Sequence, residues 1–196
     1  MGNAIRNIME LPLFDGLFAQ LIIHEPLLDV LEAVFQSTEF SFYNYKCIIK
    51  AARVSSTFRW HRDSPYVVCT TTNLITAMLC VDEMTEQNGA TVVLPGSHRI
   101  SEARISGADR DIQPEDLPDI KPVTVTCPAG SAVLFHTHII HGGGPNRSDG
   151  PRRNIIGIWT GPQTLPVGPD RYAYQGLMPR SRDPQRRRQL QMTFNC

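Results

Sequence analysis

The chain lacks an excess of either charge, since 19 Lys and Arg residues match 19 Asp and Glu residues over 196 positions. A balanced chain has no strong electrostatic field to attract nucleic acid or an anionic membrane, so neither is expected as a partner. The basic run Arg186–Arg188 lies in a polar segment and is predicted to be a solvated surface.

Long apolar runs are also missing. No stretch approaches the length of a membrane span, and residues 1–14 contain no apolar segment of signal-peptide length. The five cysteines are an odd number with no close pairing pattern, which argues against a disulfide framework. Cys69 and Cys80 lie in apolar, strand-like runs and are expected to be buried small hydrophobes. These features favour a reduced, cytoplasmic location.

The secondary structure is predicted to begin with one amphipathic helix. Over Glu25–Gln36 apolar side chains recur at helical spacing, and Pro26 suits the first turn. Short β-rich runs separated by Gly, Pro and Asn clusters follow. The expected strands are Phe40–Ile49, Val54–Arg59, Asn73–Val81, Ala90–Leu94, Val123–Thr126, Ser131–Ile140 and Asn154–Thr160. This order predicts a mainly β fold, a double-sheet jelly roll (cupin-like, double-stranded β-helix) behind a short helical region.

The length predicts a single domain, residues 1–196, with its core at about residues 40–160. Residues 101–122 are polar and poorly periodic, and a loop of that length beside a barrel is predicted to act as a lid. Residues 161–196 are predicted to form an irregular polar tail.

The tripeptide His61-Arg62-Asp63 is the first candidate for chemistry. Positions i and i+2 of a strand face the same side, so a strand here would aim one imidazole and one carboxylate at the same point. A third ligand from another strand would complete a two-histidine, one-carboxylate set, which leaves coordination positions open as an Fe(II) oxygenase requires. The alternative is a surface histidine and aspartate that are merely neighbours.

Three histidines in one later segment are candidates for the third ligand: His136, His138 and His141. If Ser131–Ile140 is one strand, His136 and His138 share a face that His141 does not, and the pattern leaves open which face points inward. The three glycines after His141 would leave space for a metal and a bound acid, which favours this histidine. Of the other two, one is expected inside the barrel and the other exposed, and His98 is expected at the surface of a turn.

Arginines follow at the start of the next apolar strand, eleven and twelve residues after His141, as Arg152 and Arg153. A hairpin would bring one of them back beside the metal, where a planar guanidinium could bind a carboxylate through two hydrogen bonds. Only one of the two can face inward, and the other is expected to be surface charge.

Four blocks of sequence between about Lys50 and Thr160 together resemble the phytanoyl-CoA dioxygenase family. They are Trp60-His61-Arg62-Asp63, residues 82–99 with their Asn88-Gly89 and Pro95-Gly96-Ser97-His98 turns, residues 130–136, and residues 141–146 with Arg152. The family consists of Fe(II)- and 2-oxoglutarate-dependent oxygenases on a jelly roll. The resemblance implies Fe(II), 2-oxoglutarate and dioxygen as cofactor and co-substrates, and a hydroxylation or desaturation that releases succinate and carbon dioxide.

Carried over by position, the resemblance makes His61, Asp63 and His141 the metal ligands and Arg152 the 2-oxoglutarate anchor. A carboxylate at Asp63 implies oxygenation, because related halogenases have a small residue there. Gly143 stands where relatives often have a serine that also contacts the co-substrate, so that hydroxyl is missing. Lys46 or Lys50 is a further candidate for contact with the co-substrate.

The substrate is expected to be a small molecule, but its identity and any oligomeric state are not encoded in a pattern that can be read. About forty residues precede the first strands, fewer than is usual in the family. A non-catalytic or truncated jelly-roll binding module is therefore the alternative to an enzyme.

Overall fold

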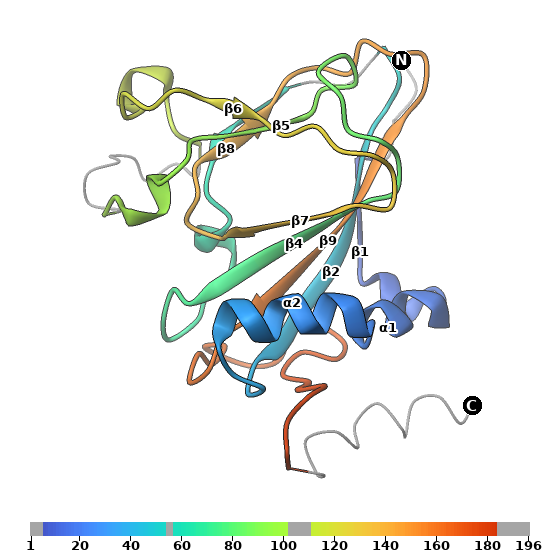
Figure 1. The fold of residues 1–196 in the computed structure, drawn as a ribbon, viewed down its shortest axis with the longest axis vertical. Coiled ribbons are helices and arrows are strands. Elements are labelled where there is room, and N and C mark those ends of the chain that lie inside the picture. The colour runs from blue at the N-terminus through green and yellow to red at the C-terminus, as the bar shows by residue number, and fades with distance from the viewer. Residues whose placement is uncertain (1–5, 54–56, 102–110, 184–196) are drawn as a thin grey trace.

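A computed structural model describes residues 6–53, 57–101 and 111–183 of the chain. Two antiparallel sheets make up the molecule, and two helices lie along one side of the larger sheet (Figure 1). The larger sheet has the strand order β1-β2-β9-β4-β7. Its strands are β1 (Asn7–Met9), β2 (Ser41–Lys50), β9 (Arg152–Thr160), β4 (Leu74–Cys80) and β7 (Ala132–His136).

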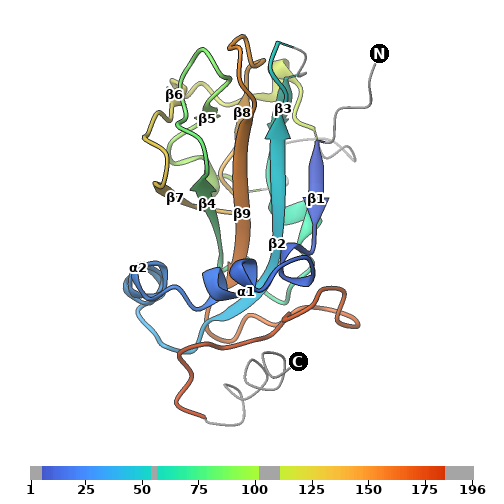
Figure 2. The same ribbon diagram turned by 90° about the vertical axis from the view of Figure 1, so that its right-hand side faces the viewer.

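The smaller sheet has the order β3-β8-β5-β6 and lies across the upper part of the larger one (Figures 1 and 2). Its strands are β3 (Phe58–His61), β8 (His141–Gly143), β5 (Thr91–Val93) and β6 (Val123–Thr124). Short 3-10 turns connect the strands: η1 (Leu11–Leu13), η2 (Ser64–Tyr66), η3 (Ser97–Arg99) and η5 (Pro114–Asp116). The architecture confirms the predicted jelly roll.

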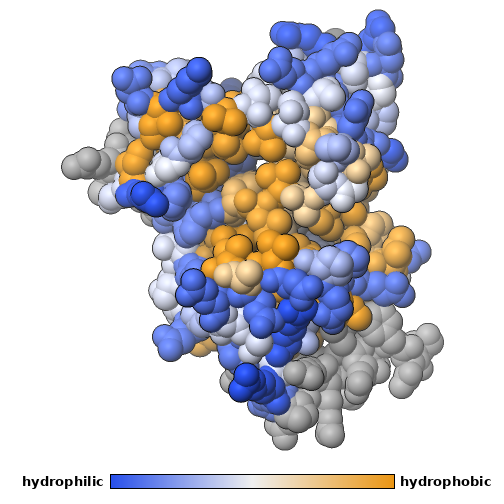
Figure 3. All heavy atoms as spheres, viewed as in Figure 1, coloured by the Kyte–Doolittle hydropathy of each residue, from blue (hydrophilic) through white to orange (hydrophobic). Residues whose placement is uncertain are grey.

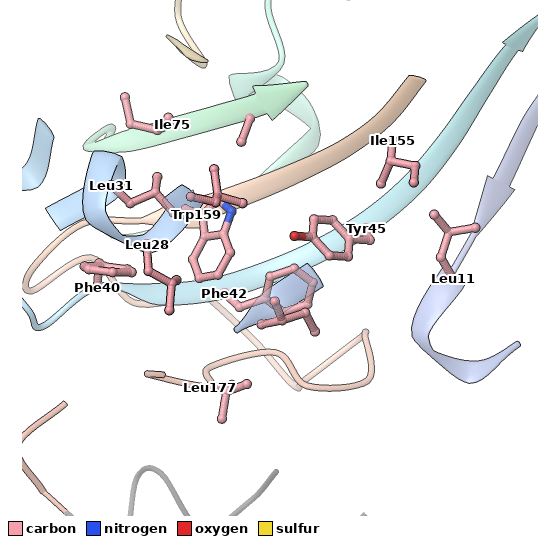
Figure 4. Packing of buried hydrophobic residues seen from close by; sticks show 13 residues of the cluster. Leu11, Leu28, Leu31, Phe40, Phe42, Tyr45, Ile75, Ile155, Trp159 and Leu177 are labelled. Atoms are coloured by element: carbon pink, nitrogen blue, oxygen red, sulfur yellow. The ribbon is translucent and has the colours of Figure 1, made fainter. Parts of the chain in front are cut away.

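The two helices, α1 (Gly16–Ile22) and α2 (Glu25–Phe35), cover the outer face of the larger sheet. Helix α2 confirms the prediction for Glu25–Gln36, and Gln36 ends the helix in the left-handed conformation with φ 52°. Leu28 and Leu31 of α2 pack over Phe42 and Trp159 of the sheet (Figure 4). This cluster is the main core between helices and sheet, so the inner face of the sheet is left for the space between the two sheets.

Successive side chains of β2 point alternately into the core under the helices and into the cavity between the two sheets. Tyr45 and Cys47 face the helices and join the main core, whereas Lys46, Ile48 and Lys50 line the cavity between the sheets. Apolar residues are visible across the middle of the face in Figure 3, between polar regions above and below. Two lysines on the inner face of a strand within the sheet are unusual, because lysine is rarely found in the interior of a protein.

The strand predicted over Ser131–Ile140 was wrong in its extent. The run Ser131–Ile140 is not one strand: β7 ends at His136, the chain turns, and β8 begins at His141 in the other sheet. Backbone groups of Thr137 fix the turn, since its N–H donates to Leu74 and its carbonyl accepts from Asp63 and Ser64. The parity argument across His136 to His141 therefore does not apply.

Other elements had not been predicted at all, namely β1, α1 and β8, which are each seven residues or shorter. Part of the segment 101–122 lies outside the described residues. Its described part runs beside β3, with Asp111 bridged to His61 and the Ile112 N–H bonded to the Trp60 carbonyl. Whether the segment acts as a lid stays a prediction.

In residues 161–183 the chain forms turns without a helix or strand. It is held to α2 by Arg180, which forms ion pairs with Glu25, Asp29 and Glu32. Arg186–Arg188 lie outside the described residues. Within the described ranges, no helix is both long and apolar enough to span a membrane.

Candidate metal centre

Three side chains converge at one end of the smaller sheet. His61 ends β3 and lies directly opposite His141, the first residue of β8, in the antiparallel register. Their ring centroids are 4.2 Å apart. Asp63 joins them, and one ligand atom from each of the three residues lies within 4.8 Å of the others. The predicted ligand set is therefore brought together by strand pairing across 80 residues of sequence.

Asp63 reaches this point by a different local structure from the one predicted. β3 ends at His61, and Asp63 has the helical angles φ −76° and ψ −29° before η2. Its N–H donates to the Thr137 carbonyl at 2.9 Å, which ties it to the turn that leads into β8. The turn, rather than strand alternation, aims the carboxylate at the histidines.

Each histidine is oriented by a hydrogen bond to the backbone. Nδ1 of His61 lies 2.8 Å from the Arg59 carbonyl, and Nδ1 of His141 lies 3.0 Å from the Ile139 carbonyl. A carbonyl only accepts, so Nδ1 carries the proton in both rings and the lone pair is left on Nε2. Such bonds fix the tautomer and the ring plane of a metal ligand.

The charge states also suit metal ligands. Burial lowers the pKa of His141, which keeps its imidazole neutral. For Asp63 burial acts to raise the pKa, but electrostatic interactions with His141 and Lys46 and the hydrogen bond from the Thr76 hydroxyl outweigh it and lower the pKa. The Thr76 hydroxyl donates to Asp63 Oδ2 at 2.8 Å. An ionised Asp63 carboxylate and a neutral His141 imidazole are donors that suit a divalent first-row metal ion.

Arg152 and Arg153 point in opposite directions. Arg152 is 2% exposed, and its buried Nε and Nη1 have no hydrogen-bond partner within the described part of the chain. Arg153 lies on the outer face, where it forms an ion pair of 2.7 Å with Asp82. Burying a guanidinium with unpaired N–H groups costs free energy. The structure therefore favours an anionic ligand as the partner of Arg152.

The arginine and the ligand cluster share one cavity of about 580 Å³. Its wall includes His61, Asp63, His141, Arg152 and the inward face of β2. A cavity of this size accommodates a small organic acid together with part of a second small molecule. The arrangement can therefore hold a metal ion, an acid and a substrate in contact.

Lys50 is a buried residue of this cavity. From the sequence it was one of two candidates, with Lys46, for contact with the co-substrate. It lies opposite Arg152 in the β2–β9 pair and is 1% exposed. Its Nζ donates to the carbonyls of Gly89 and Gly144 at 2.7 and 2.5 Å. A Cβ at Gly143 would lie only 2.9 Å from this Nζ, so the amine fills the space that a side chain at position 143 would need.

The other histidines lie apart from the ligand cluster. His136 and His138 are both half-buried, with ring centroids 5.5 Å apart, so the expectation that one of them is exposed was wrong. His98 is also half-buried, 5.5 Å from His136, rather than at the surface. Thr76 was missed altogether, because nothing in its local sequence marks a residue that hydrogen-bonds across the two sheets.

The chain was compared with known proteins at the level of sequence and of structure. It is 27% identical over 161 residues to a probable alpha-ketoglutarate-dependent hypophosphite dioxygenase of Stutzerimonas stutzeri, a match that covers 78% of this chain and 56% of that protein. It is 25% identical over 202 residues to an ectoine dioxygenase of Bordetella bronchiseptica, covering 91% of this chain and 63% of the relative. The chain thus spans little more than half the length of these relatives.

Solved structures share the fold. EctD from S. alaskensis with bound Fe has a TM-score of 0.71 and 23% identity, with 86% of this chain and 61% of that chain covered. The epimerase SnoN, in complex with Fe3+, alpha ketoglutarate and nogalamycin RO, has a TM-score of 0.73 and 18% identity, with coverages of 83% and 65%. Residues 12–154 match the family described as Phytanoyl-CoA dioxygenase (PhyH), whose metal and co-substrate are Fe(II) and 2-oxoglutarate, as the resemblance implied. The chain belongs to the phytanoyl-CoA dioxygenase family.

Proposed function

We propose that this chain is an Fe(II)- and 2-oxoglutarate-dependent dioxygenase that hydroxylates or desaturates an unactivated carbon of a small molecule. One observation carries the proposal: a three-residue ligand cluster and a buried arginine with unpaired N–H groups open into the same cavity. Membership of the family supports it. The products from the co-substrate are succinate and carbon dioxide.

His61, Asp63 and His141 would hold the iron. Two imidazoles and one carboxylate leave open coordination positions, and both Nε2 atoms are free because each Nδ1 is bonded to a carbonyl. When bound, Fe(II) would activate dioxygen, which takes two electrons from the oxidative decarboxylation of 2-oxoglutarate and two from the substrate. A carboxylate at position 63 fills the place that a halide would need, which favours oxygenation over halogenation.

Arg152 would bind the far carboxylate of 2-oxoglutarate. Its unpaired Nε and Nη1 leave N–H groups for charge-assisted hydrogen bonds to a carboxylate, and burial removes the competition of water. Lys50 lies opposite on β2, where burial and the charges of Arg152 and Arg6 lower its pKa to about 7, so its amine is a hydrogen-bond donor and, when protonated, a cation at the same end of the cavity. The chain thereby fixes where the acid lies relative to the three ligands, which is the positioning that the reaction needs.

The names of the relatives do not identify the substrate, because hypophosphite and ectoine share little chemistry. We propose that residues 1–196 act as one catalytic domain. The described cysteines, Cys47, Cys69, Cys80 and Cys127, are free thiols, which supports the proposal of a reduced, cytoplasmic location.

The direct test is the visible spectrum of the protein with Fe(II) and 2-oxoglutarate without oxygen. A co-substrate bound to the iron by two atoms is expected to give a weak metal-to-ligand absorption band that Fe(II) alone does not give. The band should disappear when an Arg152→Met variant is titrated at the same 2-oxoglutarate concentration. A folded protein that binds Fe(II) but never gives the band would refute the proposal.

The second candidate is a jelly-roll binding module that retains the metal site without turnover. The two candidates differ in one measurable property, since only the enzyme consumes oxygen and releases succinate. Metal binding without 2-oxoglutarate binding would favour the module.

A further inference from the structure

The cavity carries much more positive charge than the chain as a whole. Among the residues that the structure describes, five basic side chains line it, whereas Asp63 and Asp111 alone contribute negative charge; the basic residues are Arg6, Lys46, Lys50, Arg59 and Arg152. The full sequence has a net charge of zero. A concave site with this imbalance attracts anions and disfavours cations.

Most of these charges have a partner in the structure or in the proposed function. Arg59 forms an ion pair with Asp111 at 3.4 Å. Lys50 is held by two backbone carbonyls, and Arg152 is assigned to the co-substrate. Fe(II) and 2-oxoglutarate carry opposite charges, so binding both leaves the excess of basic side chains in place. Arg6 lies over the Phe58 ring, and Lys46 is the remaining basic residue of the five.

Lys46 has neither a hydrogen bond nor an ion pair from its ammonium group to any residue that the structure describes. It also lies at a different end of the cavity from the co-substrate anchor. In the β2–β9 pair Lys50 is opposite Arg152, whereas Lys46 is opposite Ile156. Four residues along a strand correspond to about 13 Å, so the two lysines mark separate positions on the cavity wall.

The strand register places Lys46 nearer the metal ligands than Lys50. Ile156 of β9 lies opposite Lys46 on one side and Met78 of β4 on the other, and Thr76, two residues before Met78 and on the same face of β4, donates to Asp63. An anion bound to Lys46 would therefore lie beside the metal and away from the far carboxylate of 2-oxoglutarate. Ile48 and Ile156 flank this position and provide an apolar surface for the rest of such a molecule.

We propose that the substrate of this site is a small molecule with an oxyanion, a carboxylate or phosphate group, and that Lys46 binds this group. The inference rests on the proposed function and adds the substrate class to it. Lys46 is then the residue that determines specificity for anions, and Arg6, near Phe58 at 5.8 Å, adds attraction for them in the same cavity.

The test uses matched pairs of ligands with the protein loaded with Fe(II) and 2-oxoglutarate without oxygen. Each carboxylic acid is paired with its primary amide, and each phosphate monoester with its parent alcohol. Calorimetric titration is expected to show at least tenfold tighter binding of the anionic member of a pair. Lys46→Met should remove the difference and Lys46→Arg should keep it. Arg153→Met, which removes a charge from the outer face of the same sheet, should leave it unchanged.

The affinity for 2-oxoglutarate, measured from the absorption band, distinguishes a failure of this inference from a failure of the proposed function. Equal affinities within every pair, including no binding of either member, would overturn the inference, as would an anion preference that persists in Lys46→Met. A tenfold loss of 2-oxoglutarate affinity in Lys46→Met would overturn it too, since Lys46 would then serve the co-substrate. Absence of the band in the unmodified protein would instead refute the proposed function.

Discussion

Thr76 in β4 donates a hydrogen bond of 2.8 Å to Asp63 Oδ2. β4 belongs to the larger sheet, whereas the two histidines end and begin strands of the smaller sheet. Thr76 is 0% exposed, so water does not compete for the carboxylate. The metal centre is thereby supported from both sheets, and its third ligand depends on their packing.

Thr76→Val should weaken metal binding without unfolding the protein. The substitution keeps the shape of the side chain but removes a hydrogen bond to a charged group, and outer-shell partners of this kind are worth about 10–100-fold in metal affinity. Competition with a chelator measures the loss. Thr160→Val is the control, because that hydroxyl is also buried but bonds to Ser41 away from the ligands. Equal Fe(II) affinity in the two variants would contradict the account.

Arg152→Met should raise the dissociation constant of 2-oxoglutarate strongly. Charge-assisted hydrogen bonds contribute about 1.5–3 kcal/mol, which corresponds to roughly 10–150-fold in affinity. The absorption band gives the constant directly. Arg153→Met changes the neighbouring, outward-facing residue and should have little effect on it. If both variants lost affinity equally, general charge rather than a specific contact would be responsible.

Gly143 should tolerate a side chain only after Lys50 is shortened. A Cβ at this position would lie 2.9 Å from Lys50 Nζ and 3.1 Å from the Ala90 carbonyl. Overpacking of this kind costs about 1–3 kcal/mol. In urea unfolding, Gly143→Ala should therefore cost less stability in a Lys50→Ala background than in the unmodified protein. Additive effects of the two substitutions would show that the contact does not matter.

His136 should make the fold sensitive to mild acid. Burial, with the nearby His138, His98 and Arg62, lowers its pKa to about 4, and Nδ1 accepts the His138 N–H and is therefore unprotonated. The unfolded chain protonates this residue below about pH 6.5. The unfolded state then binds more protons, so the free energy of unfolding should fall as the pH falls from 6.5 to 4.

Urea unfolding at pH 7 and pH 5 measures this fall. His136→Asn keeps an acceptor near the position of Nδ1 but does not titrate, so its stability should change less between the two pH values. His24→Asn, at an exposed histidine, should behave like the unmodified protein. A pH dependence that is unaltered in His136→Asn would assign the effect to other groups.

The fold was predictable because its signals are local. Helix α2 and the long strands carry clear periodicity, and the glycine and proline turns separate them. Elements such as β8, with three residues, are too short to show a period. The break after His136 was not visible, because Thr137, Ile139 and Ile140 are residues that favour strands and the turn is fixed by backbone bonds to Leu74 and Asp63.

The candidate site was predictable in its members but not in its geometry. His61 and His141 meet through strand register, as a barrel implies, whereas Asp63 reaches them from a turn. Thr76 and the position of Lys50 depend on contacts between segments far apart in the chain, which no pattern in one sequence encodes. The outward direction of Arg153 could be given only as an alternative until the strand pairing was known.

The most direct test of the central claim is the release of succinate from 2-oxoglutarate by the Fe(II)-loaded protein in air, with a panel of small acids as substrates. The unmodified protein should release succinate with consumption of oxygen, and Asp63→Ala should abolish release that depends on substrate. Circular dichroism of the variant checks that it is folded. Succinate release by folded Asp63→Ala at the unmodified rate would contradict the assignment of the metal ligands.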